Sequence, residues 1–330
     1  MSLLKNKERL LEFLLSSKGE YVSGEDIASR LNISRSAVWK QVASLRNDGY
    51  KINAVTNKGY ILQEESDVIS KDKIISSFQN PNSKDIFDID VFDEIDSTNS
   101  RLKSLAPSLS SEGKVIVARK QLSGRGRLGR SFFSPKDSGI YMSIFLKPSL
   151  SAEEAHFITT SASVAVCRAI EKLFSISCKI KWVNDIYLNG KKICGILTEA
   201  GFNLETGGLD YAVLGIGINL FEQEDGFSDD IKGIAGGLFD SEKDFPKKRN
   251  QLIALILEEL WLLYKAPSKM DFLEEYRSRS LLTNREITVI KGQNLASATA
   301  LYIDDSCRLV VKYDDGEIEA LSCGEVSLKI

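Results

Sequence analysis

The chain has 330 residues, 43% of them hydrophobic, which allows two or three domains with real cores, and its net charge of −3 argues against a protein that coats nucleic acid over its whole surface. Its single histidine nearly excludes a histidine-based metal cluster or a Ser-His-Asp triad, and its five cysteines lack both the C-x-x-C spacing of a zinc site and the even number of a disulfide scaffold. Reduced thiols, no apolar run of membrane length and no signal-peptide core lead us to expect a cytoplasmic protein without a membrane partner.

Charge is spread unevenly along the chain. Residues 1–62 hold ten lysines and arginines against six acids, a balance of +4, which leaves −7 for the remainder. A basic segment joined to an acidic remainder is typical of a small nucleic-acid module attached to a separate body.

The N-terminal elements follow the order of a winged helix-turn-helix, and we assign residues 1–65 to it. In chain order we expect a helix over 4–16, a second after Ser23, a third from Ser34 to about 48, and strands over 50–55 and 59–63. Ser23 and Ser34 carry hydroxyls suited to capping the helices that they precede, and an acid follows Ser23 three residues later.

The third helix is the expected DNA-reading element. Its apolar residues share one face, so the opposite face is free for the major groove. We predict that Ser36 and Lys40 approach base edges, while Arg35 and Lys58, the latter in the wing, approach phosphates. The alternative is a winged helix used only for protein contacts; the basic charge favours DNA.

A connection at 66–84 leads to an α+β body at 85–279 and to short strands at 280–330 that predict a small β-barrel. In chain order the body is expected to contain a strand from Ile86, a helix cap at Asp96–Asn99, a strand over 139–145, a capped helix over 151–174, a two-stranded hairpin over 179–200, a central strand over 211–220, and helices at about 247–265 and 269–278.

The segment VIVARKQLSGRGRLGRSFFSP, residues 115–135, carries the strongest motif. Its loop alternates three glycines with three arginines, namely Gly124, Gly126 and Gly129 with Arg125, Arg127 and Arg130. Glycines let a backbone approach a ligand, and guanidinium forks suit phosphate or carboxylate, so the loop is expected to wrap an anion. The spacing also fits a dinucleotide-binding fingerprint, but no helix follows; a solvated or nucleic-acid-binding loop is the other alternative.

Together with KWVNDIYLNGKKICGIL at 181–197 and GIGIN at 215–219, this loop resembles the bifunctional biotin–protein ligases of the biotin operon repressor family, over the whole chain. The resemblance implies a multidomain α+β protein with an N-terminal winged helix-turn-helix, a central mixed-sheet ligase domain of class II synthetase type, and a C-terminal SH3-like β-barrel. It also implies an enzyme that makes biotinyl-5′-adenylate from biotin and ATP and passes biotin to a lysine of a biotin carboxyl carrier protein.

Site residues follow from the same resemblance. Lys192, Arg125 and Arg127 are implied as catalytic, because fixed positive charge must offset the repulsion between a carboxylate and a triphosphate. Lys192 would bridge the biotin carboxylate and the α-phosphate; otherwise it is a solvated hairpin lysine. The residues implied to contact biotin are Ser97, Thr98, Asn99, Gln121, Gly124, Arg125, Lys192 and Gly195.

The nucleotide side is implied to hold Arg127, Arg130, Phe132, Lys181, Asn184 and Asn219. Asp185 is a candidate for holding Mg²⁺ with ATP, since this ion keeps waters and takes one or two carboxylates. Trp182 is expected to pack in the core.

Two residues depart from the family pattern. Phe132 stands where tryptophan is expected to stack on adenine, which leaves less stacking area. Lys329 stands where many relatives carry arginine, and a lysine lacks the two-pronged phosphate contact of a guanidinium.

Regulation follows from joining the winged helix to the ligase. We expect biotinyl-5′-adenylate to act as corepressor by ordering the arginine loop and favouring a homodimer that binds a two-half-site operator. Two alternatives stay open: a ligand-sensing transcription factor without turnover, and a lipoate-type acyl ligase. Lys192 and the three loop arginines favour catalysis, because sensing alone needs no triphosphate site.

Overall fold

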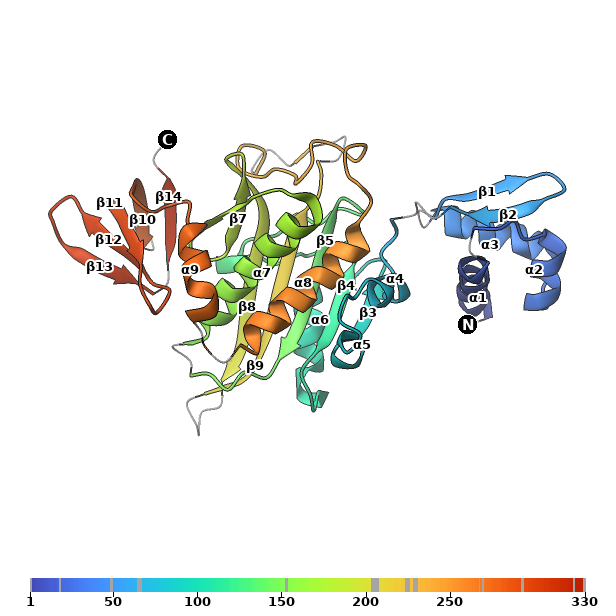
Figure 1. Ribbon diagram of the computed structural model, residues 1–330, viewed down its shortest axis with the longest axis horizontal. Coiled ribbons are helices and arrows are strands. Elements are labelled where there is room, and N and C mark those ends of the chain that lie inside the picture. Colours follow the sequence, from blue (N-terminus) through green and yellow to red (C-terminus); the bar gives the residue numbers. More distant parts are fainter. Residues whose placement is uncertain are drawn as a thin grey trace. The chain divides into compact units, whose positions relative to one another are not determined.

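The computed structural model (Figure 1) describes residues 2–17, 19–47, 50–63, 67–151, 154–202, 208–222, 226–227, 231–266, 268, 270–291, 294–322 and 324–328. Contacts divide the chain into two units, one of Met1–Ile69 with Lys247–Asn250 and one of Ser70–Pro246 with Gln251–Ile330. None of the helices in the described ranges is long and apolar enough to cross a membrane. Lys329 lies outside the described residues.

The first unit is the predicted winged helix-turn-helix. It contains α1 (Ser2–Ser16), α2 (Gly24–Leu31), α3 (Arg35–Asn47), β1 (Ile52–Val55) and β2 (Gly59–Leu62). The predicted caps are confirmed, because Ser23 Oγ accepts a hydrogen bond from Asp26 N at 3.0 Å and Ser34 Oγ accepts one from Ala37 N at 3.2 Å. One apolar face from each helix forms a common core, which includes Leu10, Leu14, Ile27, Leu31, Val38, Val42 and Leu45.

The second unit is built on a seven-stranded mixed sheet of order β3-β4-β5-β9-β8-β7-β6. Its strands are β3 (Asp88–Phe92), β4 (Lys114–Ala118), β5 (Gly139–Leu146), β6 (Lys179–Lys181), β7 (Asp185–Leu188), β8 (Lys191–Phe202) and β9 (Leu209–Asn219). Only β3 and β4 run parallel; the other neighbours are antiparallel. All eight residues of β5 are buried, and β9 lies between β5 and β8, so the predicted central position of β9 is confirmed.

The segment 179–200 differs from the expected two-stranded hairpin, because the chain turns at residues 182–184 and divides the first part into β6 and β7. The Asn189-Gly190 turn that joins β7 to β8 is confirmed. Both residues have positive φ, 49° and 78°, as a tight hairpin turn of this kind requires.

Helices cover both faces of the sheet (Figure 1). They are α4 (Lys71–Ser76), α5 (Ser83–Ile86), α6 (Thr98–Leu105), α7 (His156–Phe174), α8 (Arg249–Tyr264) and α9 (Met270–Ser278). Helix α7 begins five residues later than expected, although Ser151 N still donates to Glu154 Oε2 at 3.0 Å, as half of a capping box does. Thr198 on β8 contacts Thr159 of α7, whereas Glu199 contacts Asn99 of α6, so α6 and α7 pack on opposite faces.

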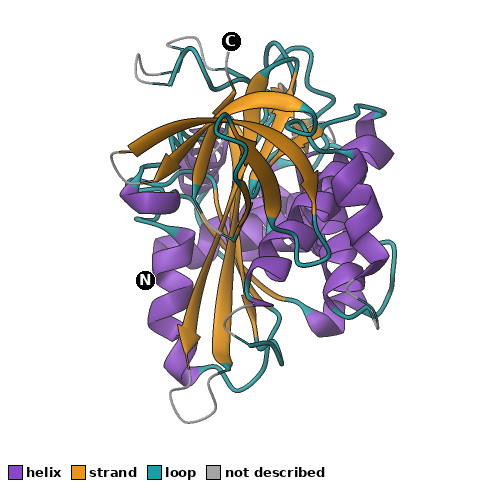
Figure 2. Ribbon diagram, turned by 90° about the vertical axis from the view of Figure 1, so that its left-hand side faces the viewer, coloured by secondary structure: helices purple, strands orange, loops and turns teal. Residues whose placement is uncertain are grey.

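The C-terminal strands form a five-stranded antiparallel sheet of order β13-β12-β11-β10-β14, as expected for the small barrel (Figure 2). They are β10 (Arg285–Lys291), β11 (Asn294–Ile303), β12 (Leu309–Tyr313), β13 (Ile318–Leu321) and β14 (Glu325–Leu328). Two hydrogen bonds to backbone carbonyls tie this sheet to the body: Trp182 Nε1 to Cys307 O at 2.9 Å and Arg277 Nε to Ile303 O at 2.8 Å. The start of β14 contacts the arginine loop, because Arg127 donates to the Gly324 carbonyl and Arg130 to Glu325.

Candidate functional site

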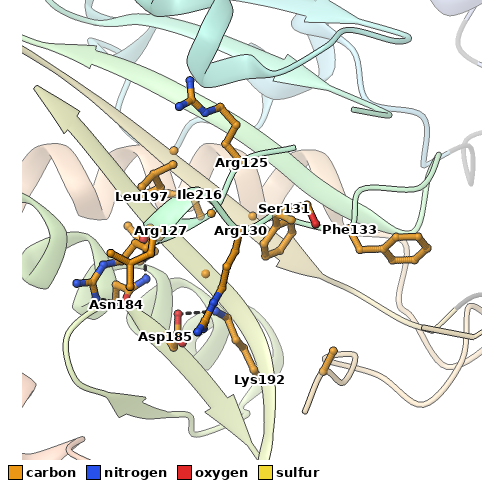
Figure 3. Close-up of a pocket in the computed structure, with 18 of the residues that line it drawn as sticks. Arg125, Arg127, Arg130, Ser131, Phe133, Asn184, Asp185, Lys192, Leu197 and Ile216 are labelled. Atoms are coloured by element: carbon orange, nitrogen blue, oxygen red, sulfur yellow. Dashed lines mark hydrogen bonds and ion pairs between the residues drawn. The ribbon is translucent and has the colours of Figure 1, made fainter. Parts of the chain in front are cut away.

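A cavity of about 340 Å³ lies where the arginine loop, strands β6 to β8, the end of β9 and the start of β14 meet (Figure 3). The structure brings together nearly all of the residues predicted to bind biotin or nucleotide. Those that line the cavity are Ser97, Thr98, Asn99, Gln121, Arg125, Arg127, Arg130, Phe132, Lys181, Asn184, Asp185, Lys192, Gly195 and Asn219.

Gly124 is the predicted site residue that does not line the cavity. It is buried, and a Cβ atom there would lie 2.3 Å from the carbonyl oxygen of Phe132 and 2.6 Å from Ser134 Oγ. Glycine is therefore required where the arginine loop folds back against its own return segment. The predicted biotin contact of Gly124 stays a prediction.

The polar residues of the site stand at the start of α6. Ser97 is the N-cap, with Oγ accepting from Ser100 N at 3.4 Å. The backbone N–H of Thr98 donates to Gln121 Oε1 at 2.9 Å, which links this end of α6 to the beginning of the arginine loop. All three of Ser97, Thr98 and Asn99 are nearly inaccessible to solvent, so their side chains belong to a preformed wall.

The three loop arginines point in different directions (Figure 3). Arg127 donates to Asn184 Oδ1 at 3.0 Å and to the Gly324 carbonyl at 3.3 Å, and Arg130 forms an ion pair with Glu325 at 2.7 Å. Arg125 lies 3.5 Å from Glu199. Arg127 thus connects the loop to the turn before β7 and to the start of β14, Arg130 makes a second contact with β14, and Arg125 contacts β8.

Lys192 and Asp185 form an ion pair with 2.6 Å between Nζ and Oδ1. Asp185 Oδ1 is buried and accepts no aligned hydrogen bond within the described part of the chain, so the contact is one of charge and lone pairs remain available on the oxygen. No group of three or more His, Cys, Asp or Glu side chains in the described ranges forms a metal cluster. An ion that needs one or two carboxylates beside phosphate fits Asp185 better than a metal that needs a full protein cage.

Lys181 stands on β6 opposite Asp185 of β7. Burial lowers the pKa of Lys181 below its ordinary value; Asp185 opposes this shift, and the positive charges of Lys192 and Arg130 add to it. Three cations therefore crowd one side of the cavity. Such crowding is unfavourable alone and becomes favourable when a polyanion lies among them.

The Phe132 ring packs against two glycines, Gly195 and Gly217. A Cβ on Gly217 would come within 2.5 Å of its ring, and a Cβ on Gly195 would lie 3.3 Å from both that ring and Lys192 Nζ. The ring also makes an edge contact with Tyr141 at 6.4 Å. An aromatic face is thus available beside the cationic side of the cavity.

Several lining residues were not predicted from the sequence. Gly215 and Gly217 alternate on β9, and this two-residue period of small side chains on a central strand was the available signal. Trp182 is only 5% exposed, as expected of a core residue, yet it also lines the cavity. Glu325 carried no local signal, because its partner Arg130 lies 195 positions earlier.

The predicted DNA-contacting residues are all exposed: Arg35, Ser36 and Lys40 on α3, and Lys58 in the turn between β1 and β2. The Lys58 ammonium lies over the Tyr21 ring, 5.8 Å from its centre. Trp39, also on α3, is 61% exposed and shares the outer face with Arg35, four residues earlier.

Profiles of three known domains match the chain in the order of its parts. The HTH domain matches residues 6–61, the Biotin/lipoate A/B protein ligase family residues 91–219, and the Biotin protein ligase C terminal domain residues 283–329. The bifunctional ligase/repressor BirA of Bacillus spizizenii is 33% identical, over 94% of this chain and 95% of its own. This chain belongs to the bifunctional ligase/repressor family. The three-part fold expected from the sequence is thereby confirmed.

Other members of the bifunctional ligase/repressor family and solved structures agree. BirA of Escherichia coli is 28% identical, over 96% of this chain and 95% of its own. The biotin protein ligase of Aquifex aeolicus, solved in complex with biotin and ATP, superposes with a TM-score of 0.60 at 27% identity, covering 73% of this chain and 98% of that one.

Proposed function

We propose that this protein is an ATP-dependent biotin–protein ligase that forms biotinyl-5′-adenylate and transfers biotin to a lysine of a biotin carboxyl carrier protein. The proposal rests on one observation: the buried polar residues at the start of α6, Lys192 and the arginine loop all line the same cavity. A cavity of about 340 Å³ falls in the range of small-molecule sites. The bifunctional ligase/repressors and the ligase solved with biotin and ATP support the choice of substrates.

Biotin fits the end of the cavity near α6. Its ureido ring needs a few convergent donors and acceptors, which Ser97, Thr98 and Gln121 offer, and its aliphatic part needs an apolar trough. Leu197 lines the cavity from β8 and supplies apolar surface there. The valeryl carboxylate would then extend past Gly195 toward Lys192.

The first step joins the biotin carboxylate to the α-phosphorus of ATP. A carboxylate oxygen forms the new P–O bond, and the bond to the bridging oxygen of pyrophosphate breaks, with that oxygen keeping the electron pair. Lys192 stands where it can contact both anions, and Arg127 and Arg130 stand where charge must be offset on the departing phosphates. Mg²⁺ bound with ATP would add charge neutralisation, and Asp185 is the side chain that we propose for it.

The second step transfers biotin to the carrier lysine. The neutral amine attacks the carbonyl carbon of the mixed anhydride, the C–O bond to phosphate breaks, and AMP leaves as the new amide loses a proton. Until then the anhydride must be kept from water. The arginine loop, whose tip residue Leu128 is 75% exposed beside the cavity, is positioned to cover it.

We further propose that the winged helix makes the protein a biotin-responsive repressor, with biotinyl-5′-adenylate as corepressor and operator DNA read by α3 and the wing. The adenylate would favour a homodimer, because a two-half-site operator calls for two copies. We propose a winged helix-turn-helix at 1–65, a linker at 66–84, a ligase domain at 85–279 and a C-terminal barrel at 280–330. The cytoplasmic location also stays a prediction. Sedimentation and operator binding, each with and without biotin and ATP, test this part; no change in either would contradict it.

The ligase proposal is tested by single-turnover transfer. The protein is mixed with MgATP, labelled biotin and an apo biotin-carrier domain, with labelled lipoate in parallel. Label on the carrier lysine with biotin alone is expected. Transfer of lipoate instead would favour the lipoate-type ligase, and ligand-dependent DNA binding without any transfer would favour the sensing factor.

A further inference from the structure

Glu199 is an acid that the proposed reaction does not use, although it lies beside the predicted biotin residues. It stands on β8, and its side chain is 16% exposed. Because Thr198 faces α7, Glu199 and Leu197 face the other side of the sheet. Leu197 lines the cavity, so Glu199 lies on the same face one pleat further along the strand.

Three groups from two segments of the chain converge on this carboxylate, two as hydrogen-bond donors and one as an ion pair. Asn99 Nδ2 lies 3.0 Å from Glu199 Oε2, and Lys103 Nζ lies 2.8 Å from Oε1. Both donors are on α6, four residues apart and therefore on one helix face. The third is Arg125 of the arginine loop, whose Nη2 lies 3.5 Å from Oε1.

The carboxylate fixes the orientation of the Asn99 amide. Burial alone would raise the pKa of Glu199, but hydrogen bonds from Lys103 and Asn99 and the charges of Lys103 and Arg125 lower it. An ionised carboxylate only accepts hydrogen bonds, so the NH₂ group of Asn99 must face it. Asn99 Oδ1 then accepts from Ser143 Oγ at 2.5 Å, and Gly215 provides the space, since a Cβ there would lie 2.1 Å from this oxygen.

Arg125 differs from the other two loop arginines in what it contacts. Arg127 and Arg130 face Asn184 and Glu325 on the side of Lys192, where phosphates are expected. Arg125 is directed away from Lys192 and Asp185 (Figure 3). Its charge is already matched by a partly buried acid at the biotin end of the cavity.

We infer that Glu199 is a positioning residue for the biotin end of the site, holding the Asn99 amide in one orientation and anchoring the arginine loop through Arg125. This inference rests on the proposed function and assigns Arg125 to biotin retention rather than to the phosphates. Biotin and its adenylate then dissociate slowly because the polar wall and the first turn of the loop are tied to the same carboxylate. ATP binding and the chemical step depend on other side chains.

The test compares Glu199→Gln with the unchanged protein in biotin-dependent ATP–pyrophosphate exchange. Glutamine keeps the shape of the side chain but removes the charge and brings an NH₂ group toward other donors. We expect the KM for biotin and the dissociation rate of the adenylate to rise about tenfold. The KM for ATP and the kcat at saturating biotin should stay within about twofold, since the side chains that we propose for ATP binding and for the chemical step are unchanged.

Two further measurements separate positioning from general damage. Glu319→Gln is the matched control, because Glu319 also pairs with a lysine, Lys291 at 2.6 Å, but lies in the C-terminal sheet. It should match the unchanged protein. A Glu199→Gln protein with unchanged KM for biotin, or with a KM for ATP raised as much as that for biotin, contradicts the inference.

Arg125→Gln keeps the inference testable if Glu199→Gln fails to fold, because Arg125 is half exposed. Alone it should raise the KM for biotin, and combined with Glu199→Gln it should add little, as expected of two partners in one contact. An Arg125→Gln protein that instead loses ATP affinity overturns the assignment. If the unchanged protein shows no exchange with biotin, the proposed function fails, which is a different outcome.

Discussion

Lys192 Nζ and Asp185 Oδ1 lie 2.6 Å apart on neighbouring strands, with Lys181 directly across from Asp185. Asp185 is thus ion-paired with Lys192 and lies opposite Lys181 in the sheet. An entering carboxylate and α-phosphate can replace Asp185 as partners of Lys192, which leaves Asp185 free for Mg²⁺. In the proposed reaction, Lys192, Asp185 and Lys181 would then contact both substrates.

Lys192→Met should lower the rate of adenylation by about 100-fold or more, because it removes the ammonium that we propose contacts both reacting anions. The unfolding temperature should change little, since Lys192 is 28% exposed. Rapid-quench measurement of biotinyl-adenylate formation gives the rate. Lys191→Met is the control: this neighbour donates to the Gly233 carbonyl on the outside of the hairpin and should keep the rate within about threefold.

Arg127→Ala should lose most adenylation activity while the fold is kept. The guanidinium joins Asn184 to the Gly324 carbonyl, so its removal costs both phosphate charge and the tie to β14. We expect a loss of about 100-fold in kcat/KM for ATP, measured by pyrophosphate exchange. Arg101→Ala, on the exposed side of α6, serves as control, and full activity of Arg127→Ala would remove the loop from the mechanism.

Gly217→Ala should weaken ATP binding about tenfold, because the added methyl would stand 2.5 Å from the Phe132 ring and force it off the floor of the cavity. The KM for ATP in exchange assays reports this. Gly233→Ala introduces the same methyl where no atom lies within 4 Å and should behave like the unchanged protein. Equal KM values for both variants would show that the position of Phe132 is unimportant.

Lys181 should make ATP binding sensitive to alkaline pH. Its pKa is lowered by burial, so the ammonium loses its proton at a lower pH than an ordinary lysine, and the KM for ATP should rise as pH increases through that value. Bound polyphosphate favours the protonated form, so ATP binding takes up a proton in the same range. Lys181→Arg stays charged, and its KM should be flat from about pH 7 to 10. Identical pH profiles would contradict this role.

Operator binding should show separate signatures for phosphate and base contacts. Arg35→Ala and Lys58→Ala should each reduce the slope of log affinity against log salt concentration by about 0.9. Lys40→Ala should instead lower the ratio of the affinity for operator DNA to that for random DNA. Binding can be followed by Trp39 fluorescence, since this ring is 61% exposed on α3. Lys51→Ala, at an exposed lysine before β1, should leave slope and preference unchanged.

Much of this architecture could be predicted because its signals are local. Caps at Ser23 and Ser34, the Asn189-Gly190 turn and the apolar run of β9 each lie within a few residues of the structure that they specify. The arginine loop was equally readable, because its glycines and arginines alternate over seven positions.

The rest depended on contacts between distant positions. Glu199 meets Asn99 from 100 residues away, and Glu325 meets Arg130 from 195, so nothing near either acid indicates a partner. Gly124 was implied to contact biotin by the family resemblance; it packs against the return of its own loop, and its contact with biotin stays a prediction. The period of a motif does not tell which of its members face the cavity.

Two cations on the side of the site where phosphates are expected already have carboxylate partners within the chain: Arg130 has Glu325, and Lys192 has Asp185. An anion that enters must compete with these acids rather than meet unopposed positive charge. An ion with one charge gains little from replacing one partner, whereas a ligand that joins a carboxylate to phosphate replaces both at once. We therefore expect the site to bind singly charged anions weakly. A molecule that carries both a carboxylate and a phosphate should bind more tightly.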